Sequence, residues 1–266
     1  MLDNRSNPRR VLVTGGANGF GLATARALLD RGHQVGIGDV DPRKLERASR
    51  TLNHPHLLPI GLDVTSRQSA RAAVEACRTG FGGLDALINS AGVIHMTPLD
   101  EITEREWNHV IDVDLKGTFL CSQAAAPLLR RSGRGRIVNI GSDAARIGCP
   151  QIVPYCAAKF GVVGLTKSLA AELAADGVTV NCVSPVGVST TGMGRSVLQR
   201  KIELSGQAPE DILAATAAEI PLQRNPTTAD IVHAILFFLS DESAFLTGVV
   251  LDVDGGMLSI LPVRGT

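Results

Sequence analysis

The sequence predicts an α/β fold built on a doubly wound parallel sheet of about seven strands, with helices on both faces. Two observations support this prediction. Short runs rich in β-branched residues alternate with longer segments of helical spacing, which is the pattern of βαβ units. The short runs are also almost continuously apolar, as expected for strands that are covered on both faces of a sheet.

The elements follow one another in this alternating order. The candidate strands are Val11–Thr14, Gln34–Gly38, Leu57–Leu62, Ala86–Asn89, Arg136–Ile140, Val178–Val183 and Val249–Val253. The clearest candidate helices are Gly21–Arg31, Pro42–Leu52, Ser66–Thr79, Glu104–Arg131, Tyr155–Ala175 and Ala229–Leu239. Spacing close to a capping box marks three of the helix starts, at Thr65 with Gln68, Thr103 with Glu106 and Thr227 with Asp230. Gly177 is placed to end the fifth helix.

The composition is that of a globular protein and argues against a nucleic-acid or anionic-membrane partner. Of the 266 residues, 44% are apolar, and 26 basic residues balance 26 acidic ones. A phosphate-rich partner calls for a surplus of basic charge. None of the five cysteines forms a C-x-x-C pair, so neither a zinc site nor a disulfide framework is indicated. Since no signal peptide or membrane-spanning run is visible, we expect a cytoplasmic protein without a bound metal.

The chain shows no linker, internal repeat or low-complexity stretch, so we expect residues 1–266 to form a single domain. The alternation breaks from about Ser184 to Pro226, where no strand is evident. Doubly wound sheets bind ligands at the carboxyl ends of their strands. Residues 184–226 are therefore predicted to form a substrate-binding lid with short helices near Arg195–Leu204 and Pro209–Ala218.

A glycine-rich turn follows the first predicted strand. Gly15, Gly19 and Gly21 allow a tight turn that opens a helix, whose N-terminus offers N–H groups to a pyrophosphate. Asp39 ends the second strand, where a carboxylate accepts hydrogen bonds from the ribose hydroxyls of adenosine and repels a 2′-phosphate. The pattern favours a Rossmann-type site for NAD over NADP, although Arg43 lies nearby. A structural turn without a ligand is the alternative.

Tyr155 is the only tyrosine of the chain, and it stands four residues before Lys159. On a helix these two side chains share one face. A phenol has a pKa of about 10, and a nearby ammonium group lowers this pKa toward the range useful for acid/base catalysis. Ser142 follows the strand Arg136–Ile140 through Gly141, where its hydroxyl could bond a substrate oxygen beside the phenol.

Together these motifs resemble those of the short-chain dehydrogenase/reductase family, from Val11 to Met257. The matching segments are Thr14–Gly21, Asp63–Val64, Asn89–Gly92, Ser142, Tyr155–Lys159, Pro221–Arg224 and Thr247–Gly256. The resemblance implies an oxidoreductase that transfers a hydride between NAD(H) and a secondary alcohol or ketone, cyclic or apolar ones included. It also implies that Tyr155 is the acid/base, that Ser142 positions the substrate oxygen, and that Lys159 holds the nicotinamide ribose.

The resemblance extends to the remaining contacts. The cofactor-binding residues that it implies are Gly15, Asn18, Gly19, Phe20, Gly21, Asp39, Val40, Asp63, Val64, Asn89, Ala91, Gly92, Tyr155, Lys159, Pro185, Val188 and Thr190. On the substrate side it implies His95, Ser142, Gln151 and Val186. Members of the family usually assemble as tetramers through their two long central helices, so we expect a homotetramer.

Two positions depart from the family pattern. Asp114 stands where the family usually has an asparagine that supports a water relay to the lysine. An ionised carboxylate cannot donate a hydrogen bond and opposes formation of the tyrosinate, so we expect Asp114 to shift the alkaline side of the activity profile upward. A tolerated near-isostere is the alternative. Val186 replaces a usual glycine, and a β-branched residue does not readily adopt a positive φ, so we expect a locally different loop.

Two other functions remain open at this level. One is an NADPH-dependent ketoreductase of the 3-oxoacyl-carrier-protein type, against which Asp39 argues. The other is a non-catalytic dinucleotide sensor on the same fold. The presence of Ser142, Tyr155 and Lys159 disfavours the sensor, whereas Asp114 keeps it open.

Overall fold

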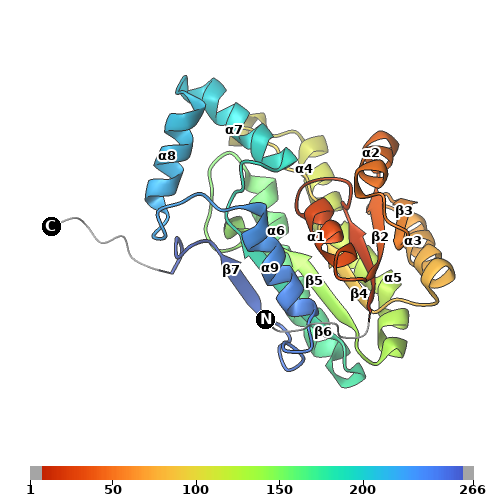
Figure 1. The fold of residues 1–266 in the computed structure, drawn as a ribbon. Helices are drawn as coiled ribbons and strands as arrows, with labels where there is room; N and C mark the ends of the chain where they lie inside the picture. Colours follow the sequence, from red (N-terminus) through yellow and green to blue (C-terminus); the bar gives the residue numbers. More distant parts are fainter. Residues whose placement is uncertain (1–7, 260–266) are drawn as a thin grey trace.

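The computed structural model describes residues 8–259 and confirms the predicted doubly wound fold (Figure 1). Seven parallel strands form one sheet in the order β3-β2-β1-β4-β5-β6-β7. They are β1 (Arg10–Thr14), β2 (Gln34–Asp39), β3 (Leu57–Gly61), β4 (Ala86–Asn89), β5 (Arg136–Ile140), β6 (Thr179–Pro185) and β7 (Val250–Val253). The winding direction reverses between β1 and β4, which leaves a crevice at their carboxyl ends, where such sheets bind ligands.

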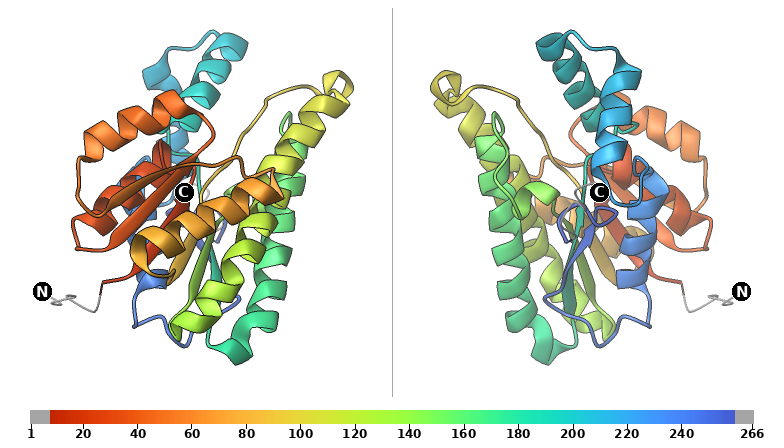
Figure 2. Two further views of the ribbon diagram at one scale, coloured as in Figure 1. Left: turned by 90° about the vertical axis from the view of Figure 1, so that its right-hand side faces the viewer. Right: turned by 90° about the vertical axis from the view of Figure 1, so that its left-hand side faces the viewer.

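Helices cover both faces of this sheet (Figure 2). One layer contains α1 (Gly19–Leu29), α2 (Pro42–Leu52) and α9 (Thr228–Leu239). The other contains α3 (Arg67–Phe81), α4 (Glu104–Val110), α5 (Gly117–Ser132) and α6 (Val153–Leu173). Alternate strand residues supply the two cores, with Leu12 and Leu87 on one face of the sheet and Val13 and Ile88 on the other. These buried apolar contacts hold the three layers together.

The predicted lid contains two helices, α7 (Gly192–Ser205) and α8 (Pro209–Glu219), which stand apart from the two layers (Figure 1). Both were expected, although α7 begins three residues earlier because the side chain of Thr191 caps it. The boundary at Ser184 was wrong, since β6 continues through Pro185. The start predicted at Thr65 was also wrong, because the side chain of Ser66 accepts the capping hydrogen bond from Ser69.

The long helix predicted at Glu104–Arg131 is not one regular α-helix. A π-helical turn, Ile111–Lys116, separates α4 from α5. The sequence could not reveal this turn, because apolar periodicity is the same in a π turn and in the surrounding α-helix. Turns of this kind are frequent at functional sites. The turn contains Asp114, which is 0% exposed, and the hydroxyl of Thr118 donates to the Asp114 carbonyl at 2.7 Å.

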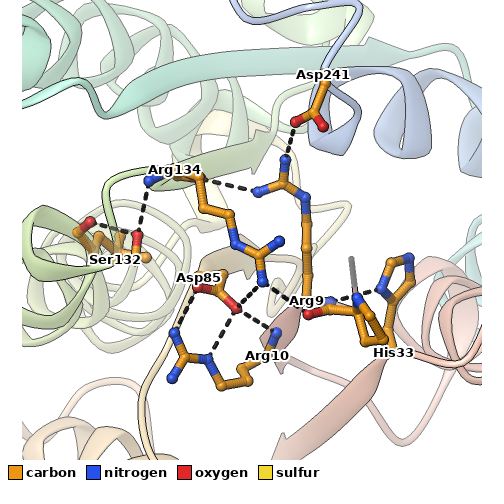
Figure 3. Close-up of polar contacts among 9 residues, drawn as sticks. Arg9, Arg10, His33, Asp85, Ser132, Arg134 and Asp241 are labelled. Carbon is orange, nitrogen blue, oxygen red and sulfur yellow. Dashed lines mark hydrogen bonds and ion pairs between the residues drawn. The ribbon is translucent and has the colours of Figure 1, made fainter. Parts of the chain in front are cut away.

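A network of ion pairs joins the strands at the amino end of the sheet, opposite the crevice (Figure 3). The carboxylate of Asp85 is fully buried and accepts hydrogen bonds from Arg10 Nε at 2.9 Å, Arg10 Nη2 at 2.7 Å and Arg134 Nη2 at 3.0 Å. Burial by itself would raise the pKa of Asp85, but these hydrogen bonds lower it to about 2. The carboxylate therefore stays ionised and links β1 to the starts of β4 and β5.

Arg9 extends this network across the sheet (Figure 3). Its backbone N–H donates to His33 Nδ1 at 2.9 Å, and its guanidinium donates to Asp241 Oδ1 at 2.6 Å. Burial and the positive charges of neighbouring arginines lower the pKa of His33 to about 4. The imidazole is therefore neutral at pH 7, as an acceptor of this hydrogen bond must be.

None of the helices within residues 8–259 combines the length and apolar character that a bilayer crossing requires.

Candidate active site

A cavity of about 950 Å³ opens at the carboxyl ends of the strands and is bordered by α7 and α8. Its size lies at the upper end of the range for ligand pockets, so one cavity has room for two ligands side by side. Residues from the ends of β1, β2, β4, β5 and β6 border it, together with the start of α6. Within residues 8–259, no three His, Cys, Asp or Glu side chains gather in a way that could hold a metal ion.

Most of the residues singled out in the sequence meet at this cavity. Those expected to contact a dinucleotide and found there are Gly15, Asn18, Gly19, Phe20, Asp39, Val40, Asp63, Val64, Ala91, Gly92, Tyr155, Lys159, Pro185 and Val188. On the substrate side, Ser142 and Val186 border the same space. Segments far apart in the sequence thus converge because the parallel strands all end at one edge of the sheet.

The glycine-rich turn packs tightly against neighbouring backbone because its glycines carry no side chains. Gly15 has a φ of 62°, and a Cβ added there would lie 2.8 Å from the Cα of Ala91. A Cβ on Gly21 would clash with the carbonyl oxygen of Gly15, so Gly21 shapes the turn from behind without bordering the cavity. The side chain of Asn18 caps α1 by accepting from Gly19 N at 2.8 Å. The cradle fits the diphosphate of a dinucleotide at a helix N-terminus.

The carboxylate of Asp39 stands at the end of β2, where its Oδ1 accepts from Asp41 N at 3.0 Å. Asp41 caps α2, as its position before Pro42 indicated. The basic side chain that borders the cavity here is Lys44, whose Nζ lies 3.8 Å from Asp41 Oδ2. Arg43, the nearby basic residue noted in the sequence, is not among the residues that border this cavity. Lys44 lies one position further along α2, and the helical turn decides which of the two side chains reaches the cavity.

The phenol of Tyr155 and the ammonium of Lys159 lie on one face of the first two turns of α6. Lys159 Nζ is 5.3 Å from the centroid of the Tyr155 ring and donates a hydrogen bond to the carbonyl of Ile140 at 3.0 Å. Tyr155 is 8% exposed and Lys159 is 4% exposed. Because Ile140 ends β5, this hydrogen bond fixes the ammonium at the carboxyl edge of the sheet.

The hydroxyl of Ser142 lies just beyond the end of β5. It donates to Asp143 Oδ1 at 2.6 Å and accepts from Ala144 N at 3.2 Å, which caps the short 3-10 helix Asp143–Ala145. Asp143 also borders the cavity and was missed in the sequence, although it directly follows Ser142. The Ser142 proton has an acceptor in this arrangement, so the hydroxyl must rotate to donate elsewhere.

Asp114 reaches Lys159 from the π turn. Its Oδ2 pairs with Lys159 Nζ at 3.2 Å, and its Oδ1 accepts from Val93 N at 2.8 Å. Two donors therefore face this carboxylate, which explains how an acceptor-only side chain is accommodated here. Burial raises the pKa of Asp114, whereas Lys159 and the Val93 N–H lower it.

The charges of these three groups are coupled. Burial raises the pKa of Tyr155, the Lys159 ammonium lowers it, and the Asp114 carboxylate raises it. The sequence led us to expect a lowered pKa from the nearby ammonium, but burial outweighs Lys159 and the pKa of Tyr155 lies above the ordinary value. Burial disfavours the charged form of Lys159, but Asp114 and Tyr155 hold its pKa above the ordinary value. Lys159 is therefore an ammonium at neutral pH.

Six predicted site residues do not border the cavity. They are Gly21, Asn89, His95, Asp114, Gln151 and Thr190. The amide of Asn89 is buried and donates to Ser122 Oγ at 3.0 Å and Asn139 Oδ1 at 2.8 Å. Thr190 is exposed on the loop before α7, and its neighbour Thr191 borders the cavity instead.

Of the predicted substrate-side residues, His95 and Gln151 lie off the cavity. The ring of His95 packs against His109 with 5.8 Å between centroids, and His109 is the histidine that borders the cavity. Gln151 has a φ of 65°, and its carbonyl accepts from Thr97 N at 2.8 Å. These tertiary contacts leave no sequence signal.

Val186 borders the cavity without a positive φ, and its N–H donates to the Val253 carbonyl at 3.3 Å, extending the β6–β7 pairing.

Comparisons with known proteins agree with this geometry. A family model described as "Enoyl-(Acyl carrier protein) reductase" matches residues 15–258. The chain is 37% identical to 2-(S)-hydroxypropyl-CoM dehydrogenase 3 of Xanthobacter autotrophicus, over 97% of this chain and 100% of that protein. It is 36% identical to cis-4-hydroxycyclohexanecarboxylate dehydrogenase of Sinomonas cyclohexanicum, over 95% and 97% of the two chains.

Solved structures give the same result. The crystal structure of sorbitol-6-phosphate 2-dehydrogenase SrlD from Erwinia amylovora superposes with a TM-score of 0.88 at 31% identity, covering 94% of this chain and 100% of that one. This chain agrees with these proteins in both fold and sequence over nearly its full length, which assigns it to their family. The chain belongs to the short-chain dehydrogenase/reductase family, and it is an oxidoreductase that acts on the CH–OH group of secondary alcohols.

Proposed function

We propose that this protein is an NAD-dependent dehydrogenase that interconverts a secondary alcohol and a ketone, with Tyr155 as the acid/base. One observation carries the proposal. The Tyr155 phenol and the Lys159 ammonium, 5.3 Å from the ring centroid, border the same cavity as the glycine-rich turn and Asp39. A proton-transfer group and a dinucleotide cradle are thus side by side, which is what oxidation of an alcohol by hydride transfer requires.

The residues fit the cofactor, and each has a role in the reaction. The turn around Gly15 would hold the diphosphate, Asp39 the adenosine ribose and Lys159 the nicotinamide ribose. When bound, the nicotinamide ring supplies the hydride acceptor or donor. Tyr155 takes the proton of the substrate hydroxyl during oxidation and returns it during reduction, and the Lys159 charge stabilises the tyrosinate in between.

Ser142 positions the substrate oxygen in this proposal. Its hydroxyl turns from Asp143 toward the alcohol and holds the reacting C–O group beside the phenol of Tyr155. The lid helices α7 and α8 cover the cavity and exclude water from the hydride path. Exclusion of water also strengthens the effect of Lys159 on Tyr155, because charges interact more strongly where the dielectric is low.

The substrate we propose is a secondary alcohol held against apolar side chains. Ile94, Met96, Val186, Met193 and Leu213 border the cavity and offer such a surface. The two relatives compared above are named for substrates with a secondary hydroxyl, one of them cyclic. Both observations support an apolar or cyclic carbon skeleton around the reacting centre.

NADP is the second candidate for the cofactor, and one observation favours it. Lys44 borders the cavity near Asp39, where an ammonium group could neutralise a 2′-phosphate. The Asp41 carboxylate 3.8 Å away compensates part of its charge, and the Asp39 carboxylate would repel the phosphate. We therefore retain NAD as the cofactor, and NADPH-dependent reduction of a 3-oxoacyl substrate as the alternative.

We also propose a homotetramer built on α4, α5 and α6. The aromatic side chains of Trp107, Phe119 and Phe160 lie on these helices and are 40%, 37% and 47% exposed. Exposed aromatic residues are enriched where proteins associate. Sedimentation equilibrium should give about four times the chain mass of 27.9 kDa.

The central experiment is a screen of secondary alcohols with NAD and of ketones with NADH, followed by nicotinamide absorbance. We expect turnover that Tyr155→Phe reduces by about a thousandfold or more, because the acid/base group is lost. Binding of NADH to this variant should persist. A wild-type protein that binds NADH but oxidises no alcohol would contradict the proposal and favour a dinucleotide sensor.

A further inference from the structure

Charged side chains from the lid border the cavity without a role in the reaction proposed above. Lys201 borders the cavity from α7, together with Met193 and Val197. These three residues are spaced four apart and therefore lie on one face of the helix. The face of α7 that borders the cavity is thus apolar near its start and cationic further along.

The other charged groups of α7 have partners, whereas Lys201 has none that the structure describes. Arg200 Nη1 lies 3.3 Å from Glu203 Oε2, and Arg195 Nη1 donates to the carbonyl of Thr190. Among residues 8–259, no carboxylate oxygen comes within the 4.0 Å ion-pair distance of Lys201 Nζ. Its ammonium is therefore available to a ligand in the cavity.

The acidic side chain on the facing lid helix does not change this conclusion. Glu219 borders the cavity from α8, but it is the last residue of that helix. Lys201 lies four residues before the end of α7, next to the short connection that leads into α8. The two charges therefore lie toward opposite ends of the helix pair.

The position of Lys201 along α7 sets how far it stands from the cofactor turn. α7 begins at Gly192 beside the cofactor turn, where an added Cβ would clash with the side chain of Asn18. Lys201 follows nine residues later, about 13 Å further along the helix axis. The side chains of Leu198, from α7, and Leu213, from α8, border the same cavity. This part of the cavity therefore offers a ligand both apolar surface and one positive charge.

We propose that Lys201 binds an anionic group, a carboxylate or sulfonate, at the end of the substrate remote from the secondary alcohol. The enzyme then selects hydroxy acids over neutral alcohols of the same length. This inference rests on the proposed dehydrogenase function and deepens it. Since Lys201 lies on an exposed part of the lid, the ion pair is worth about two- to fivefold in kcat/KM and weakens with added salt.

The test compares acids with uncharged amides of equal length. The probes are 5-hydroxyhexanoate, 7-hydroxyoctanoate and 9-hydroxydecanoate, each beside its amide, with NAD as the oxidant. For wild type we expect the acid to exceed the amide by about two- to fivefold in kcat/KM at one length or more, mainly through KM. In Lys201→Gln this ratio should fall to about one, with amide oxidation unchanged. Arg200→Gln is the matched control, since this neighbouring residue pairs with Glu203 outside the cavity, and it should keep the wild-type ratio.

Failure of the inference is distinguishable from failure of the proposed function. Oxidation of the amides with no preference for any acid would overturn the role of Lys201 and leave the dehydrogenase function standing. Equal loss of activity on acid and amide in Lys201→Gln, with weaker NADH binding, would assign Lys201 to the cofactor and also overturn it. If no amide or acid is oxidised at any length, the proposed function fails first and the inference falls with it.

Discussion

The ammonium nitrogen of Lys159 lies 3.2 Å from Oδ2 of Asp114, in a place where both side chains are almost fully buried. Lys159 also approaches the ring of Tyr155, so one ammonium group serves two acidic partners. The carboxylate stabilises the ammonium but competes with the phenol for its charge. The balance between these two contacts decides at which pH Tyr155 can act as a base.

Replacing Asp114 by Asn should move the pH profile of alcohol oxidation toward lower pH. The Asp114 carboxylate raises the pKa of Tyr155, so a neutral amide lets the tyrosinate form more readily. We expect the rising limb of kcat/KM against pH to shift downward by about one unit. Asp112→Asn is the control, because Asp112 lies on the same π turn but pairs with Lys116 Nζ at 3.0 Å near the surface. An unchanged profile in Asp114→Asn would mean that the carboxylate is a tolerated substitute for the amide.

Direct titration of Tyr155 should reveal the effect of burial. Because the chain contains a single tyrosine, the tyrosinate absorbance reports on this residue alone once the Tyr155→Phe background is subtracted. Burial raises the pKa of Tyr155 in the free protein, so its midpoint should lie above that of free tyrosine. We expect bound NAD, with its cationic nicotinamide, to lower the midpoint of Tyr155 below that of free tyrosine. A midpoint that does not move when NAD binds would mean that the nicotinamide ring lies away from Lys159 and Tyr155.

Asp39 and Lys44 should set the cofactor preference with opposite signs. Asp39→Asn removes the repulsion of a 2′-phosphate and should raise kcat/KM for NADP relative to NAD by about tenfold or more. Lys44→Gln should lower the use of NADP further and leave NAD little changed. Arg43→Gln, next to Lys44 but off the cavity, is expected to have no effect on the ratio. A strong wild-type preference for NADP that Lys44→Gln abolishes would favour the ketoreductase alternative.

The buried imidazole of His33 should make stability depend on pH below neutrality. Burial and the charges of Arg9, Arg31 and Arg134 lower the pKa of His33 in the folded protein to about 4. An unfolded chain binds the proton at about pH 6.5, so protonation favours unfolding and stability falls as the pH decreases from about 6.5 to about 4. Because His33 is partly exposed, we expect a loss of about 1 kcal/mol between pH 7 and pH 5. Urea unfolding should show that His33→Gln lacks this part of the decrease; an equal decrease in both proteins would contradict the assignment.

Local patterns were enough to predict the secondary structure and its order. All seven strands appear where apolar runs indicated them, and Thr103 and Thr227 form the expected capping boxes with Glu106 and Asp230. Such features depend on residues a few positions apart, whose preferences act in any chain context. The same locality limited the prediction at Ile111–Lys116, where a π turn and an α-helix share one apolar pattern.

The sequence by itself determined the parallel α/β fold, the glycine-rich turn and the presence of Tyr155, Lys159 and Ser142 in consistent positions. Only the tertiary structure decided which side chains meet. It brought Asp114 into an ion pair with Lys159, which lies 45 residues away in the sequence. It also put Lys44 at the cavity instead of Arg43, and His109 instead of His95. The physical reason is that such contacts depend on how helices are rotated and packed on the sheet. A rotation of one residue, about 100° on a helix, is enough to exchange the side chain that faces the site.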